Sequence, residues 1–175
     1  MNYWIVADIC SDLPKTYVYA QERLTLMPMN YTMAGKEYSY LIYNRRHPSA
    51  LLRDLSAHVS VPLDAGAMER ACRHLPGTHD FAAFQAAGGT AKTTIRRIDS
   101  VSVGRQGDEI RLVIYGTAFL YNMVRIIAGT LIAIGLGRLN EDAFKRGIGT
   151  GDRLALGPTA PACGLALEKV WYPGE

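Results

Sequence analysis

The sequence predicts an α+β fold, in which a mostly antiparallel sheet carries helices packed on one face. Segments with strand character follow one another closely enough to pair locally, and helical segments stand in blocks between them. The chain has 175 residues, of which 49% are hydrophobic and 20% charged. These values are typical of one folded domain, or one lobe of a larger enzyme, with a core of its own.

The first clear strand is predicted over residues 38–43, where aromatic and β-favouring residues stand between Gly35 and a turn at 44–48. A helix is then predicted from an N-cap at Asp64 to about Leu75. Pro76-Gly77 ends it. One stripe of this helix is apolar at helical spacing: Met68, Ala71, Cys72 and Leu75.

A β-hairpin follows, because residues 98–103 and 109–115 flank a loop that contains Gly104 and Gly107. The apolar segment 118–136 predicts a buried helix and not a membrane span, since Asn122 and Arg125 would be costly at bilayer depth. A short helix opening at 140–142 and closing at 145–147, and a last strand over 164–171, complete the pattern.

Composition limits the classes of function. The net charge of +3 permits a nucleic-acid partner without requiring one. Three widely spaced cysteines without a CxxC pair indicate reduced thiols in a cytoplasmic protein: Cys10, Cys72 and Cys163. The four histidines lack any metal-ligand spacing, so no metal is expected. Residues 3–10 are apolar but lack a basic leader, so no signal peptide is expected.

Arg125 is the most informative single residue, because it stands in the middle of a helix that is apolar nearly all round. A guanidinium cannot lose its charge and therefore needs acceptors when it is partly buried. A carboxylate, a phosphate or a set of carbonyls should face it. The alternative is an arginine that extends to the surface or pairs with a local acid such as Asp152.

Two further features suggest nucleic-acid contact. Tyr38 lies in an aromatic-rich strand and could stack on a nucleobase, or it could be an ordinary core aromatic. Lys92, Arg96 and Arg97 surround a polar loop after two glycines. They could contact phosphates, or they could be ordinary charges on a solvated loop.

Several segments, in this order along the chain, resemble motifs of TruA-type tRNA pseudouridine synthases. The longest is GTAFLYNMVRIIAGTL at residues 116–131. The others are KEYSYLIYN (36–44), HDFAAF (79–84), TTIRRI (93–98), DRLALGPTAPACGLAL (152–167) and VWYP (170–173). The resemblance covers residues 27–175 as a C-terminal domain, whereas residues 1–26 form a poorly matched lead segment.

The resemblance implies a pseudouridine-synthase-like half and a role for individual residues. Tyr38 matches the tyrosine that stacks on the target uracil, Arg125 the arginine that pairs with the catalytic aspartate, and Leu165 a residue that lines the uracil pocket. Lys92, Arg96 and Arg97 would contact RNA. The family isomerises uridine to pseudouridine in the tRNA anticodon arm, as a homodimer, without cofactor or metal.

The chain also departs from the family pattern. The motif that carries the catalytic aspartate, Gly-Arg-Thr-Asp-Ala-Gly-Val, does not occur in the sequence, and Asp64 stands in a superficially similar Leu-Asp-Ala-Gly at the wrong place. Thr117, Asn122 and Ile126 replace the usual Asn, His and Asn of the family. The expectation is a fragment that is inactive alone. The alternative is a non-catalytic RNA-binding or dimerisation module of the same fold.

Overall fold

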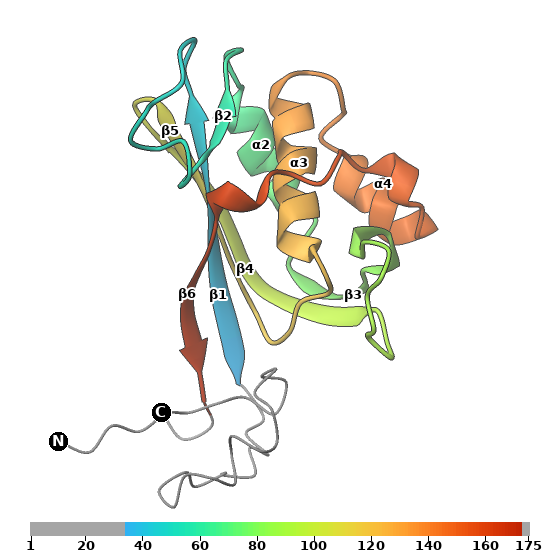
Figure 1. Cartoon of the computed structure of the whole chain (residues 1–175). Helices are drawn as coiled ribbons and strands as arrows, with labels where there is room; N and C mark the ends of the chain where they lie inside the picture. The colour runs from blue at the N-terminus through green and yellow to red at the C-terminus, as the bar shows by residue number, and fades with distance from the viewer. Residues whose placement is uncertain (1–33, 173–175) are drawn as a thin grey trace, which may run out of the picture. The chain divides into compact units, whose positions relative to one another are not determined.

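The computed structural model describes residues 34–172, and there a six-stranded sheet carries three α-helices on one face (Figure 1). The predicted α+β class is therefore confirmed. The strands are β1 (Gly35–Asn44), β2 (Ala57–Val59), β3 (Gly77–Asp80), β4 (Ile95–Gln106), β5 (Glu109–Gly116) and β6 (Leu165–Trp171). The helices are α2 (Ala65–Cys72), α3 (Met123–Gly135) and α4 (Ala143–Thr150).

Strand β1 is the centre of the sheet. The strand order is β2-β1-β5-β4-β3, and β6 also pairs with β1. Because β5 pairs with residues 36–43 along one edge of β1, both β6 and β2 must occupy the other edge. There β6 is antiparallel over the first part of β1, and the short β2 is parallel over the last part. Tyr38 thus lies between Ile114 of β5 and Leu167 of β6.

The core lies between the sheet and the helices. Ile110, Leu112 and Ile114 alternate along β5 and are at most 1% exposed, so the period-two pattern of the sequence correctly identified the buried face. Helix α3 contributes eleven buried residues of its thirteen, which explains why it is apolar nearly all round. No helix among residues 34–172 is long and apolar enough to cross a membrane.

Helix α2 begins where the sequence predicted. The Asp64 carboxylate accepts a hydrogen bond from the Ala67 backbone N–H at 2.9 Å, which makes it a conventional N-cap. The helix ends at Cys72, three residues before the predicted end, and Leu75 is buried in the turn that follows. Burial raises the pKa of the Cys72 thiol to about 12, so this cysteine is held as an unreactive thiol.

Replacing Asp64 with alanine should lower the free energy of unfolding by about 1 kcal/mol, because one N-terminal N–H of α2 loses its acceptor. Urea denaturation followed by circular dichroism would measure this loss. Asp64→Asn retains an acceptor oxygen and is the matched control, expected within about 0.5 kcal/mol of the parent. Equal loss in both variants would contradict the capping role.

The predicted apolar helix starts later than expected. Residues 118–122 form a loop, and α3 begins only at Met123. Asn122 has a left-handed backbone, with φ 59° and ψ 11°, which no continuous right-handed helix can contain. Helix α4 also lies later than predicted: it runs from Ala143 to Thr150, and Gly151 follows it with a left-handed φ of 67°.

Two short strands, β2 and β3, were not predicted. Each has only three or four residues, and each is defined by pairing with a longer strand: β2 with β1, and β3 with β4. The hairpin loop is tighter than predicted, because Gly104 lies within β4 opposite Arg111 and only residues 107–108 connect the strands. The lead segment 1–26, with Cys10, lies outside the described residues.

Candidate functional site

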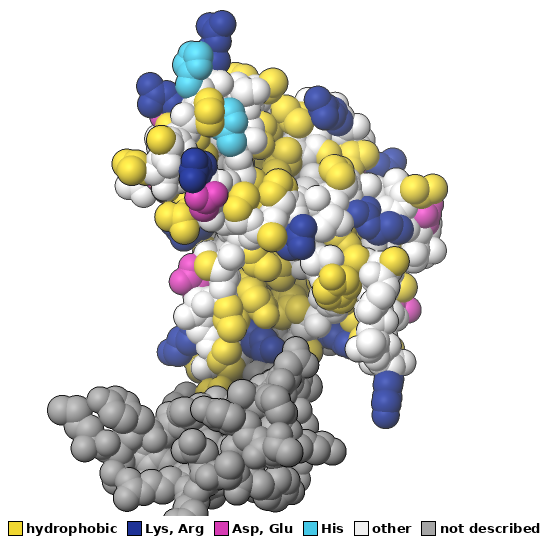
Figure 2. All heavy atoms as spheres, in the orientation of Figure 1, with side chains coloured by type: hydrophobic (Ala, Val, Ile, Leu, Met, Phe, Trp, Pro, Cys, Tyr) yellow, Lys and Arg dark blue, Asp and Glu magenta, His cyan; other side chains and the backbone are white. Residues whose placement is uncertain are grey.

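Tyr38, Arg125 and Leu165 line one pocket of about 240 Å³. They come from three different elements: β1, the first turn of α3, and the start of β6. The sequence placed these residues far apart, and the fold brings them together. The other lining residues belong to one continuous stretch: Phe119, Leu120, Tyr121, Asn122, Met123 and Val124. Figure 2 shows hydrophobic side chains gathered over the space between β6 and the start of α3.

The Tyr38 ring is held from one side and open towards the pocket. Phe119 meets it edge to face, with ring centroids 5.2 Å apart and an interplanar angle of 84°. Burial raises the pKa of the Tyr38 phenol, so the hydroxyl stays protonated at neutral pH. A half-buried tyrosine beside a phenylalanine offers an apolar wall for a planar ring.

Arg125 is half-buried, and its acceptors are neutral. Its Nε–H donates to the Ala160 carbonyl at 2.8 Å, and Nη1 donates to Asn122 Oδ1 at 3.0 Å. The expectation that oxygen acceptors would face this guanidinium is met by a carbonyl and an amide. Within residues 34–172 no ion pair joins Arg125 to Asp152, whose carboxylate accepts from the Leu154 N–H at 2.8 Å. Among residues 34–172, no acidic side chain lines the pocket.

The segment 157–161 fixes Arg125 in place by docking closely on α3. The Ala160 N–H donates back to the Arg125 carbonyl at 3.0 Å, and the Gly157 N–H donates to Thr130 Oγ1 at 3.0 Å. Gly129 lets the two backbones approach, because a Cβ at this position would lie 1.7 Å from the Pro158 carbonyl oxygen. This segment therefore supports the side of the site on which Arg125 lies.

Tyr40 joins the same segment to the sheet. Its hydroxyl donates to the Pro161 carbonyl at 2.6 Å, and the side chain is fully buried. Burial raises the pKa of this phenol and outweighs the opposing effect of Arg125, so Tyr40 remains a donor at neutral pH. Leu165 pairs with Tyr40 across β6 and β1, which sets the position of Leu165 at the pocket.

The predicted basic residues lie on a different part of the fold. Lys92 is exposed in the loop before β4, and Arg96 and Arg97 begin that strand. None of the three lines the pocket. Arg97 pairs with Asp99 at 2.7 Å, whereas Arg96 bonds Thr93 Oγ1 and the Ile95 carbonyl. The Arg96 Nε atom is buried and has no acceptor among residues 34–172.

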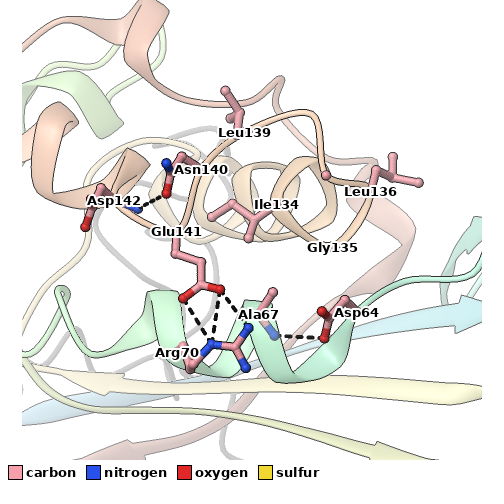
Figure 3. Close-up of a pocket in the computed structure, with 11 residues that line it drawn as sticks. Asp64, Ala67, Arg70, Ile134, Gly135, Leu136, Leu139, Asn140, Glu141 and Asp142 are labelled. Atoms are coloured by element: carbon pink, nitrogen blue, oxygen red, sulfur yellow. Dashed lines mark hydrogen bonds and ion pairs between the residues drawn. The ribbon is translucent and has the colours of Figure 1, made fainter.

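A larger pocket of about 570 Å³ lies between α2 and the end of α3 (Figure 3). It contains none of the predicted site residues. Glu141 and Arg70 form a forked ion pair, with an Nη2 to Oε1 distance of 2.7 Å, and this contact lowers the pKa of Glu141. Asp64 also borders this larger pocket, but its carboxylate already accepts the N-cap hydrogen bond of α2. These polar groups satisfy one another, which indicates a structural junction between helices.

Sequence reasoning assigned no contact to three residues at the smaller pocket, although Asn122 was noted as a departure from the family motif. Phe119 supports Tyr38, Tyr121 is 57% exposed at the edge, and Asn122 contacts Arg125. All three stand in the loop that the sequence assigned to a helix. The available signal was Asn122, since asparagine tolerates the left-handed backbone that separates a loop from a helix start.

The pocket and fold together define a class: an α+β domain with an aromatic-lined site and an arginine at a helix start. Residues 71–173 match the family model described as tRNA pseudouridine synthase. The chain is 48% identical over 142 residues to tRNA pseudouridine synthase A of Acetivibrio thermocellus, covering 81% of this chain and 58% of that protein. It is 41% identical over 168 residues to tRNA pseudouridine synthase A 2 of Clostridium perfringens, covering 95% and 69%.

The tRNA pseudouridine synthase A of Pelobacter propionicus is 49% identical over 138 residues, covering 79% of this chain and 57% of that protein. The chain therefore belongs to the tRNA pseudouridine synthase family, which is a family of isomerases. It spans 57–69% of the length of these three relatives.

Proposed function

We propose that this chain forms part of an enzyme that isomerises uridine to pseudouridine in the anticodon arm of tRNA. The observation that carries the proposal is that Tyr38, Arg125 and Leu165 line the same pocket. In this proposal the Tyr38 ring stacks on the target uracil, Leu165 packs against the base, and Arg125 holds the catalytic carboxylate. The target base must leave its stack in the RNA to reach such a pocket.

The reaction also needs a group that the described pocket does not supply. Isomerisation breaks the bond from the ribose to N1 of uracil, forms a bond from the ribose to C5, and releases the C5 hydrogen. A carboxylate nucleophile or base performs the first step. Arginine and tyrosine can orient and polarise but cannot replace it, and no acidic side chain lines the pocket within residues 34–172. We therefore predict that this chain alone is inactive.

A second reading is a non-catalytic module that binds RNA or dimerises. It is favoured by one observation, namely that neutral acceptors already hold Arg125. These two acceptors supply part of the hydrogen bonding that a half-buried guanidinium requires, without a carboxylate. In both readings Lys92, Arg96 and Arg97 would contact the RNA backbone, the chain would form a homodimer, and it would act in the cytoplasm. Charge-based contacts of this kind weaken as salt rises.

Activity is tested by incubating the purified chain with an anticodon-arm RNA that carries tritium at C5 of uridine. We expect no tritium release above the level without protein, whereas a complete relative such as the Acetivibrio thermocellus enzyme should release it. Release by this chain, abolished by Tyr38→Ala and by Arg125→Ala, would overturn the predicted inactivity while supporting the proposed pocket.

RNA binding tests the basic residues, whose role is the same in both readings. Fluorescence anisotropy with the same RNA should show binding that weakens about tenfold in the Arg96→Ala/Arg97→Ala double variant, since two phosphate contacts are lost. Arg138→Ala, at an exposed position between α3 and α4, is the matched control and should bind like the parent. Equal binding by both variants would contradict the assigned RNA contacts.

A further inference from the structure

Asn122 combines two unusual features at the pocket. It is the one non-glycine residue within 34–172 that has a positive φ, at 59°. It also occupies the N-cap of α3 without making the usual side-chain bond to the helix N–H groups. A left-handed backbone costs a non-glycine residue on the order of 1 kcal/mol, so the surrounding structure must hold it there.

The Asn122 side chain is directed at Arg125 instead. Its amide group lies 3.0 Å from Arg125 Nη1. A guanidinium has donors only, so the atom that it contacts must be the carbonyl oxygen of the amide. This requirement fixes the orientation of the amide and leaves its NH₂ group pointing elsewhere. That NH₂ group has no partner among the described residues, and Asn122 lines the pocket.

Arg125 is consequently held at two points. Ala160 accepts from Nε on one side, and Asn122 accepts from Nη1 on the other. With both bonds in place the planar guanidinium cannot rotate about its Nε–Cζ bond without losing the Asn122 contact. The Ala160 bond alone would fix Nε but leave the two Nη groups free to exchange positions.

We propose that Asn122 is a positioning and specificity-determining residue of this site. Its carbonyl oxygen orients Arg125, and its NH₂ group donates a hydrogen bond to a ring carbonyl of the bound pyrimidine. The second role rests on the proposed function, whereas the first concerns the protein without any ligand. Uracil carries two such carbonyl acceptors, so a donor at the pocket wall suits its recognition.

The positioning role is tested by NMR on the chain labelled with ¹⁵N. In the parent protein, rotation about the Arg125 Nε–Cζ bond should be slow. Asn122→Ala should accelerate it about tenfold, and Asn122→Asp should keep it slow because an acceptor oxygen remains. Asn122→Gly, which accepts the left-handed backbone without strain, keeps the test valid if the alanine variant unfolds. Unchanged rotation in both the alanine and glycine variants would overturn this role.

The donor role is tested by titrating the same proteins with uridine and following the amide shifts of the pocket residues. Asn122→Asp retains the Arg125 contact but loses the NH₂ group, so uridine should bind about tenfold more weakly than to the parent. Equal affinity would overturn the donor role. If the parent itself does not bind uridine, the donor role and the proposed base pocket both fail. The rotation measurement would still decide the positioning role.

Discussion

Replacing Gly129 with alanine is expected to lower the free energy of unfolding by about 3 kcal/mol or more, or to prevent folding. The added Cβ would lie 1.7 Å from the Pro158 carbonyl oxygen, 2.9 Å from its carbonyl carbon and 3.1 Å from the Ala160 nitrogen. All three are backbone atoms, so no side-chain rotation can relieve the overlap. The whole segment 157–161 would have to move away from α3.

This movement would also disturb the candidate site, because the same segment carries the Ala160 carbonyl that accepts from Arg125. Thermal and urea unfolding would measure the loss of stability. Gly149→Ala is the matched control: this glycine lies in α4, and nothing lies within 4 Å of an added Cβ. That variant should be unchanged or up to about 1 kcal/mol more stable. A similar effect of both substitutions would contradict the close approach of α3 and residues 157–161.

Replacing Asn44 with alanine is expected to have the second large effect, which is to lower the free energy of unfolding by about 3 kcal/mol. Asn44 is 7% exposed at the end of β1, and its side chain bonds the last residue of β2 and the segment that follows. Its Nδ2 donates to the carbonyls of Val59 and Val61 at 2.9 and 2.7 Å, and its Oδ1 accepts from the Leu63 N–H at 3.0 Å. Alanine would leave a buried N–H and two carbonyls unpaired.

The contributions can be separated by denaturation of two further variants. Asn44→Asp keeps an acceptor for Leu63 and for the Arg105 guanidinium, which also bonds Oδ1, but directs a carboxylate at two carbonyls. It should lose stability as well. Asn140→Ala removes an exposed amide that, within residues 34–172, accepts only from the Asp142 N–H, and it should cost less than about 1 kcal/mol. Equal losses for Asn44→Ala and Asn140→Ala would refute the central role of Asn44.

Local sequence patterns were sufficient to predict a helix or strand wherever one face of that element is buried and the other is exposed. The alternating apolar residues of β5 and the stripe of α2 each identified the buried side, since burial of one face has a fixed period in the sequence. They failed at β2, which is three residues long, because its strand state depends on pairing with β1. They also failed at residues 118–122, where apolar composition alone does not distinguish a packed loop from a helix.

At the candidate site, too, the sequence predicted one part and the tertiary structure decided another. The sequence by itself determined the family through the order of its motifs, and it identified Arg125 as a cation in apolar surroundings that requires acceptors. Only the tertiary structure decided which acceptors these are: Ala160, thirty-five residues away, and Asn122 in a left-handed conformation. The sequence around a buried charge shows that it requires a partner. Which partner it finds depends on the packing of segments that are distant in the sequence, such as the close approach of α3 and Pro158 that Gly129 allows.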